Sequence, residues 1–91
     1  MVNNYDYKMF VADGCPFCAQ AKEKLKDKIA NGKIEILNVI HNPAASELAK
    51  KHNIRDVPTF LVKDNVLNTT EVCDLTKDAR KLMCNGKEVV L

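Results

Sequence analysis

The first half of the chain shows two hydrophobic periodicities in turn, and these predict a strand, a helix and a second strand. Residues 5–11 have the two-residue period of a strand with apolar side chains on both faces, which is typical of a central strand covered by helices. One face carries Tyr5, Tyr7, Met9 and Val11, and the other carries Phe10. Residues 15–32 then have a partial apolar stripe at helical spacing, and residues 33–40 return to a strand pattern. The short links indicate a βαβ unit with a right-handed crossover.

The pattern continues with a second helix and two further strands. A helix is expected over residues 43–52, because Asn42 suits the N-cap and a proline follows at the first helical position. Residues 59–63 are a clear strand, and residues 66–72 are a weaker returning strand. Asp64-Asn65 indicates the turn between them, because both residue types tolerate a left-handed backbone.

The C-terminal stretch supports two interpretations. We expect a helix, because apolar positions fall at helical spacing, namely Leu75, Ala79, Leu82 and Met83. The alternative makes strands of residues 71–75, 81–84 and 87–91, with Asn85-Gly86 as a tight turn. Cys73 and Cys84 separate the two interpretations: they face each other in the hairpin, where they can form a disulfide or bind a metal. In the helix they lie about three turns apart, too far for a bond.

Composition and charge narrow the class of protein. The chain has 91 residues, of which 46% are apolar, and this indicates one globular domain over residues 1–91. A net charge of +2 from 14 basic and 12 acidic residues is too balanced to indicate nucleic-acid or membrane partners. No apolar run approaches the roughly 20 residues of a membrane span, and residues 1–6 lack the apolar core of an export signal. We therefore expect a cytoplasmic monomer, in which four cysteines indicate catalysis or metal binding.

The candidate chemistry lies in Cys15-Pro16-Phe17-Cys18, between the first strand and the first helix. A cysteine at a helix N-terminus faces unpaired N–H groups and the positive end of the helix dipole, which stabilise a thiolate and lower the pKa of the thiol. We expect Cys15 to be the nucleophile and Cys18, one turn inside the helix, the resolving thiol. Cys15 would form a mixed disulfide with a substrate, and Cys18 would then resolve it. This chemistry needs no cofactor and no metal.

Two segments carry a resemblance to a known family: residues 10–18, which end in the two cysteines, and residues 54–60, which contain Val57-Pro58. Over residues 7–72 the chain resembles the thioredoxin superfamily, and most closely its glutaredoxin-like branch. The resemblance implies an α/β thioredoxin fold, with a four-stranded mixed sheet flanked by helices. It also implies that Pro58 is cis and lies against the dithiol, and that the Val57 backbone pairs with an extended substrate. The other expected substrate contacts are Gly14, Pro16 and Phe17.

The motif also departs from the usual glutaredoxin pattern. Cys-Pro-Phe-Cys is similar to the Cys-Pro-Tyr-Cys of dithiol glutaredoxins, but Ala12 and Asp13 stand where glutaredoxins usually carry a lysine that helps to hold glutathione. Asp13 and Asp56 would disfavour the carboxylates of glutathione. We therefore expect an enzyme that reduces disulfides in protein substrates, with a thioredoxin-reductase-like reductant. The alternatives are a glutathione-dependent glutaredoxin, with glutathione as the reductant, and a non-catalytic module that binds metal through its cysteines.

Overall fold

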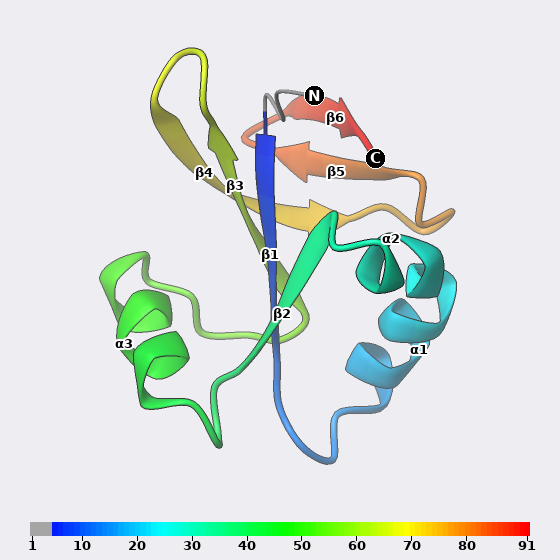
Figure 1. Cartoon of the computed structure of the whole chain (residues 1–91), viewed down its shortest axis with the longest axis vertical. Coiled ribbons are helices and arrows are strands. Elements are labelled where there is room, and N and C mark those ends of the chain that lie inside the picture. The colour runs from blue at the N-terminus through cyan, green and yellow to red at the C-terminus, as the bar shows by residue number, and fades with distance from the viewer. Residues whose placement is uncertain (1–4) are drawn as a thin grey trace.

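The computed structural model describes residues 5–91 and shows a mixed sheet with helices on both faces (Figure 1). Residues 1–4, part of the predicted domain, lie outside the described residues. The elements in chain order are β1 (Tyr5–Val11), α1 (Pro16–Lys24), α2 (Lys26–Ala30), β2 (Ile34–Asn38), α3 (Pro43–Lys51), β3 (Thr59–Asp64), β4 (Thr69–Leu75), β5 (Lys81–Cys84) and β6 (Lys87–Val90). No helix within residues 5–91 is long and apolar enough to cross a membrane.

The sheet has six strands in the order β2-β1-β3-β4-β5-β6. β1 is parallel to β2, and every other neighbouring pair is antiparallel. The register places Met9 beside Ile36 on β2 and beside Phe60 on β3. The first four strands of this order, with their helices, reproduce the predicted β-α-β-α-β-β arrangement. The expected four-stranded sheet is therefore present and is extended by two further strands.

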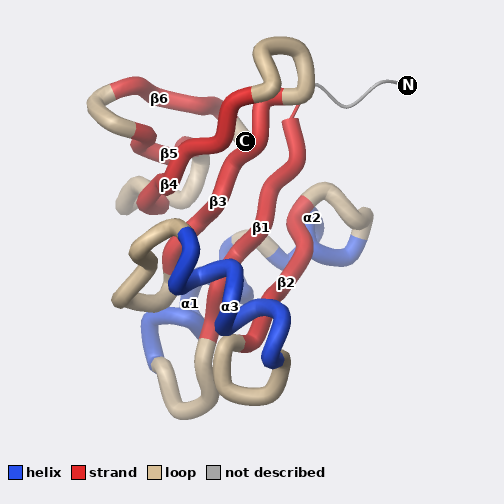
Figure 2. Tube along the Cα trace, turned by 90° about the vertical axis from the view of Figure 1, so that its left-hand side faces the viewer, coloured by secondary structure: helices blue, strands red, loops and turns tan. Residues whose placement is uncertain are grey.

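The two faces of the sheet have separate hydrophobic cores, because successive side chains of β1 point to opposite faces. Met9 and Val11 pack with Cys18 and Leu25 in the core under α1 and α2, and Phe10 packs with Ala49 of α3 on the other face. Figure 2 shows α3 in front of the sheet, α1 and α2 behind it, and β4 to β6 at one side. The predicted central position of the first strand is confirmed.

Two elements end earlier than the sequence pattern predicted. The helix expected over residues 15–32 is interrupted at Leu25, whose ψ of 14° separates α1 from α2. Leu25 is buried and Ile29 packs against the same core, so the interruption directs both side chains towards the sheet.

The second strand ends at Asn38 rather than at residue 40. The side-chain oxygen of Asn38 accepts hydrogen bonds from the backbone N–H groups of Ile40 and His41 and so turns the chain.

The predicted C-terminal helix is wrong, and the alternative hairpin of β5 and β6 is present. Asn85 and Gly86 both have positive φ, at 53° and 81°, as a two-residue turn of this twist requires. Leu82 and Cys84 are fully buried in the core under α1, whereas Met83 between them is partly exposed. The two-residue period of a strand therefore describes this segment, because alternate side chains of β5 are buried in that core.

A disulfide between Cys73 of β4 and Cys84 of β5 links this hairpin covalently to the neighbouring strand. The β4–β5 register pairs Asp74 with Met83 and Leu75 with Leu82, so the two cysteines lie directly opposite each other, with 4.4 Å between their Cα atoms. Both cysteines are buried to 1% exposure or less. This bond is the result that the sequence analysis named as incompatible with a C-terminal helix.

Candidate active site

The loop between β1 and α1 presents Cys15 at the start of the helix. Gly14 has a φ of +72°, a conformation that glycine adopts without the steric penalty of a Cβ atom. Cys15 is the N-cap of α1, and its Sγ accepts a hydrogen bond of 3.1 Å from the backbone N–H of Cys18. Pro16 fills the first helical position, where no N–H is needed. The predicted cap is therefore confirmed in its atomic detail.

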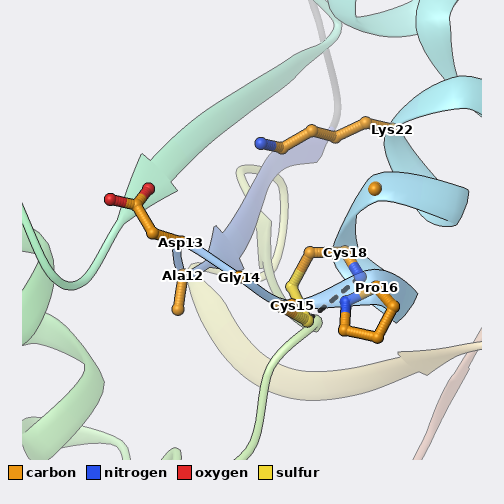
Figure 3. Close-up of a pocket in the computed structure, with 8 residues that line it drawn as sticks. Ala12, Asp13, Gly14, Cys15, Pro16, Cys18 and Lys22 are labelled. Carbon is orange, nitrogen blue, oxygen red and sulfur yellow. Dashed lines mark hydrogen bonds between the residues drawn. A yellow bond between two sulfur atoms is a disulfide. The ribbon is translucent and has the colours of Figure 1, made fainter.

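The two cysteines of the motif form a disulfide, with 5.2 Å between their Cα atoms (Figure 3). Their exposure differs: Cys15 is partly exposed, whereas the side chain of Cys18 is 1% exposed and belongs to the core under α1. An incoming molecule can therefore reach the sulfur of Cys15 more readily than the sulfur of Cys18.

The loop before β3 brings a second segment against Cys15. The Val57–Pro58 peptide bond is cis, as the family resemblance implied. The carbonyl oxygen of Val57 lies 3.6 Å from the Sγ of Cys15, although the two residues are 42 positions apart. Thr59 is buried, and its hydroxyl donates a hydrogen bond to the backbone carbonyl of Asp56, which fixes the loop. The structure thus brings Val57-Pro58 to the dithiol.

The other three predicted substrate contacts lie on the surface around Cys15. Gly14 and Pro16 are exposed, and the Phe17 ring is 68% exposed. Segment 12–16 and the facing side of α1 line an open hollow beside the disulfide, into which the Lys22 side chain extends (Figure 3). Both cysteines of the motif are among the residues that line this hollow.

Asp13 forms a polar cluster with Asn38 and His41, and the sequence patterns did not predict this cluster. Its carboxylate accepts a hydrogen bond of 3.0 Å from the side-chain amide of Asn38, and it contacts Nε2 of His41. The hydrogen bond from Asn38 is the largest cause that holds the pKa of Asp13 below its usual value, followed by His41, with Lys22 contributing through its charge. The signal that could have indicated this cluster is the predicted pairing of the first two strands as parallel neighbours. In the observed β1–β2 register, Val11 pairs with Asn38.

The cysteines of the described chain form two separate disulfides, and the two pairs do not combine into one site. Within residues 5–91, no three His, Cys, Asp or Glu side chains are grouped so that they could hold a metal ion. The structure therefore offers no four-cysteine centre of the kind that the metal-binding alternative requires.

Comparison with known proteins agrees with this geometry. The model of the glutaredoxin family matches residues 7–67, more than half of the chain. The match includes both cysteines of the motif and the Val57-Pro58 loop, and it ends before β4, so the disulfide-bonded hairpin lies outside it. No curated protein matches the chain. The chain belongs to the glutaredoxin family of thiol–disulfide oxidoreductases, within the thioredoxin superfamily.

Proposed function

We propose that this protein reduces disulfides in protein substrates, with Cys15 as the nucleophile and Cys18 as the resolving thiol. The observation that carries the proposal is the unequal exposure of two bonded sulfurs: Cys15 is partly open to solvent, and Cys18 is buried one turn inside α1. A nucleophile must be reached by its substrate, whereas a resolving thiol needs to reach only its neighbour.

The steps balance in sulfur, protons and electrons. The Cys15 thiolate attacks one substrate sulfur, the substrate disulfide breaks, and the leaving sulfur takes up a proton. The Cys18 thiol then loses its proton and attacks Cys15, which releases the second substrate sulfur as a thiol. The dithiol has given two electrons to the substrate and is left as the Cys15–Cys18 disulfide. An external reductant returns the two electrons.

Backbone groups around Cys15 act on the thiolate in opposite directions. The N–H of Cys18 donates to its sulfur, and the first turn of α1 has no acidic side chain to oppose a negative charge. The carbonyl oxygen of Val57 faces the same sulfur and favours a neutral thiol, which can donate a hydrogen bond to it. The helix N-terminus supports the ionised form, because its N–H groups and its dipole act together.

The surroundings of Cys15 support a protein as the substrate. Phe17, whose ring is exposed, follows Cys15 by two residues, and the backbone carbonyl of Val57 lies 3.6 Å from the Cys15 Sγ. An extended segment of a partner can lie across these groups and present its disulfide to Cys15. The open hollow imposes no enclosing wall that would limit the substrate to a small molecule.

The charges near the dithiol favour a reductant other than glutathione. Asp13 lines the hollow beside Cys15, and the exposed Asp56 directly precedes Val57. These carboxylates repel the two carboxylates of glutathione, and the lysine that glutaredoxins usually carry before the first cysteine is absent. We therefore propose a thioredoxin-reductase-like protein as the electron source.

The test compares the wild-type protein with Cys15→Ser and Cys18→Ser in the reduction of insulin disulfides. NADPH consumption is measured with thioredoxin reductase in one series and with glutathione and glutathione reductase in the other. We expect turnover with the reductase and loss of turnover in Cys15→Ser. The matched control is Cys73→Ala/Cys84→Ala, which should keep its turnover at a temperature where it is folded. Full activity in Cys15→Ser would contradict the proposal, and faster turnover with glutathione would favour the glutathione-dependent alternative.

A further inference from the structure

The carboxylate of Asp13 is fixed in position although it lies on the surface. Asn38 donates to one of its oxygens, and His41 contacts the other. Asn38 is itself held, because its side-chain oxygen accepts two backbone N–H groups of the turn that follows β2. Both partners of the carboxylate belong to a hydrogen-bonded turn, so they hold the carboxylate in one position. Its negative charge is therefore localised.

The carboxylate lies on the rim of the hollow that Cys15 also lines. Asp13 precedes Cys15 by two residues, which limits the separation of their Cα atoms to about 7 Å. Both residues line the same hollow, and Figure 3 shows the Asp13 side chain at one side of it, with its carboxylate directed away from the disulfide. A substrate seated on Cys15 can therefore bring its own charged groups within the screening length of about 8–10 Å from this carboxylate at physiological salt.

Lys22 opposes this effect, as does His41 when its ring is protonated. Lys22 extends into the same hollow from α1, and its charge contributes to the lowered pKa of Asp13. Lys22 is exposed and has no hydrogen bond or ion pair among the described contacts, whereas Asp13 has two partners. A flexible lysine spreads its charge over a larger volume, whereas the carboxylate keeps its charge at one place on the rim of the hollow.

We infer that Asp13 is a specificity-determining residue that selects disulfides with a positive charge beside them, such as protein segments in which lysine or arginine neighbours a cysteine. The inference rests on the proposed function and adds the charge class of its substrate. Asn38 is a positioning residue, because its neutral amide acts on the substrate only through Asp13.

The expected size follows from Coulomb's law in water. A pair of unit charges about 8 Å apart changes an encounter equilibrium by about 2.3-fold. A cationic disulfide loses that attraction when Asp13 becomes neutral, and an anionic disulfide loses an equal repulsion. The ratio of their rates therefore changes about fivefold at low salt.

The experiment uses three small disulfides as probes: cystamine, which is cationic, hydroxyethyl disulfide, which is neutral, and glutathione disulfide, which is anionic. Reduced protein is mixed with each probe in excess at low salt and quenched with acid. Intact mass then gives the rate of oxidation. The ratio of the cystamine rate to the glutathione disulfide rate is compared among variants, so that any change in the thiolate fraction cancels, because the same sulfur attacks both probes.

Asp13→Asn should lower this ratio about fivefold, and 0.5 M salt should reduce the difference. Lys22→Gln should raise the ratio, because it removes the opposing charge. Asn38→Ala should lower it in the same direction as Asp13→Asn if Asn38 acts by positioning. Asp78→Asn is the matched control and should leave the ratio unchanged: Asp78 is also exposed, and hydrogen bonds also lower its pKa, but it does not line the hollow.

An unchanged ratio in Asp13→Asn, with normal oxidation by hydroxyethyl disulfide, would overturn this inference and leave the proposed function standing. If the neutral probe oxidised wild-type and Cys15→Ser protein at the same rate, the proposed function itself would fail. The two failures are therefore distinguishable by the neutral probe.

Discussion

The Cys73–Cys84 disulfide lies outside the matched family region, and its removal gives the sharpest test of how the C-terminal hairpin is held. β5 meets β4 through a short ladder whose register pairs are Asp74 with Met83 and Leu75 with Leu82. The buried disulfide adds a covalent bond at the end of that ladder. We predict that Cys73→Ala/Cys84→Ala folds, because the hairpin turn and the burial of Leu82 persist, but with a large loss of stability.

The magnitude follows from the loop that the bond closes. The cysteines are 11 residues apart, and closing a loop of that length in the unfolded chain stabilises the native state by about 3 kcal/mol. For a domain of this size, each kcal/mol shifts the midpoint of thermal unfolding by about 4–8 °C. The melting temperature should therefore fall by about 12–24 °C.

The assay is thermal unfolding followed by circular dichroism in a Cys15→Ala/Cys18→Ala background, in which no thiol remains to exchange with the hairpin disulfide. Cys73→Ala and Cys84→Ala are added together to that background, and both proteins are measured with and without reductant. Prolonged strong reductant should lower the melting temperature of the parent and leave the alanine variant unchanged. A drop of less than about 3 °C on removal of both cysteines would refute the reasoning, because the loop estimate requires several times that.

Three further predictions concern the core, the cluster at Asp13 and the surface. Leu25→Ala should lower the free energy of unfolding by about 2–5 kcal/mol in urea, because Leu25 is 1% exposed; a loss under 1 kcal/mol would contradict its role in the core. The pKa of Asp13 is lowered from 3.8 on folding, so the stability from this carboxylate is present above about pH 4 and is lost progressively as the pH falls further; the difference between the wild-type and Asp13→Asn melting temperatures should shrink below pH 4, and a difference that grew there would contradict this. Phe17→Ala should slow insulin reduction several-fold but not hydroxyethyl disulfide reduction, and equal effects on both would exclude a protein contact.

Local chemistry made much of the fold predictable. Pro16 after Cys15 defined the start of α1, and Asn42 before a proline defined the start of α3; both caps are present. The strand expected over residues 59–63 is present as β3, directly after the cis Pro58. In each case the residue type restricts its own backbone or satisfies a nearby N–H, so the sequence contains the physical cause.

The C-terminal hairpin shows where local patterns fail. Leu75 and Leu82 fit a helical period and also a pair of facing strands, so spacing alone cannot choose between them. The choice depends on contacts distant in sequence, above all the packing of Leu82 and Cys84 on the sheet. The turn Asn85-Gly86 was the local feature that favoured the hairpin, because both residue types adopt positive φ at low cost.

Some residues of the candidate site were likewise predictable from the sequence, and others were not. Cys15 and its cap follow from residues that are adjacent in sequence, and they were predicted. The partners of Asp13 come from positions 25 and 28 residues further along the chain, and their contacts depend on how the ends of β1 and β2 are aligned. A sequence pattern predicts that two strands pair, but it does not specify which side chains meet beyond their ends.

The most direct test of the central claim is to identify the sulfur that attacks the substrate. Cys18→Ser protein is mixed with a disulfide-bonded protein, quenched by alkylation and digested without reductant, and mass spectrometry locates the mixed disulfide. The account predicts that the substrate is bound through Cys15, which the buried Cys73 and Cys84 cannot replace. A substrate adduct on either of those two cysteines, or no adduct on Cys15, would contradict it.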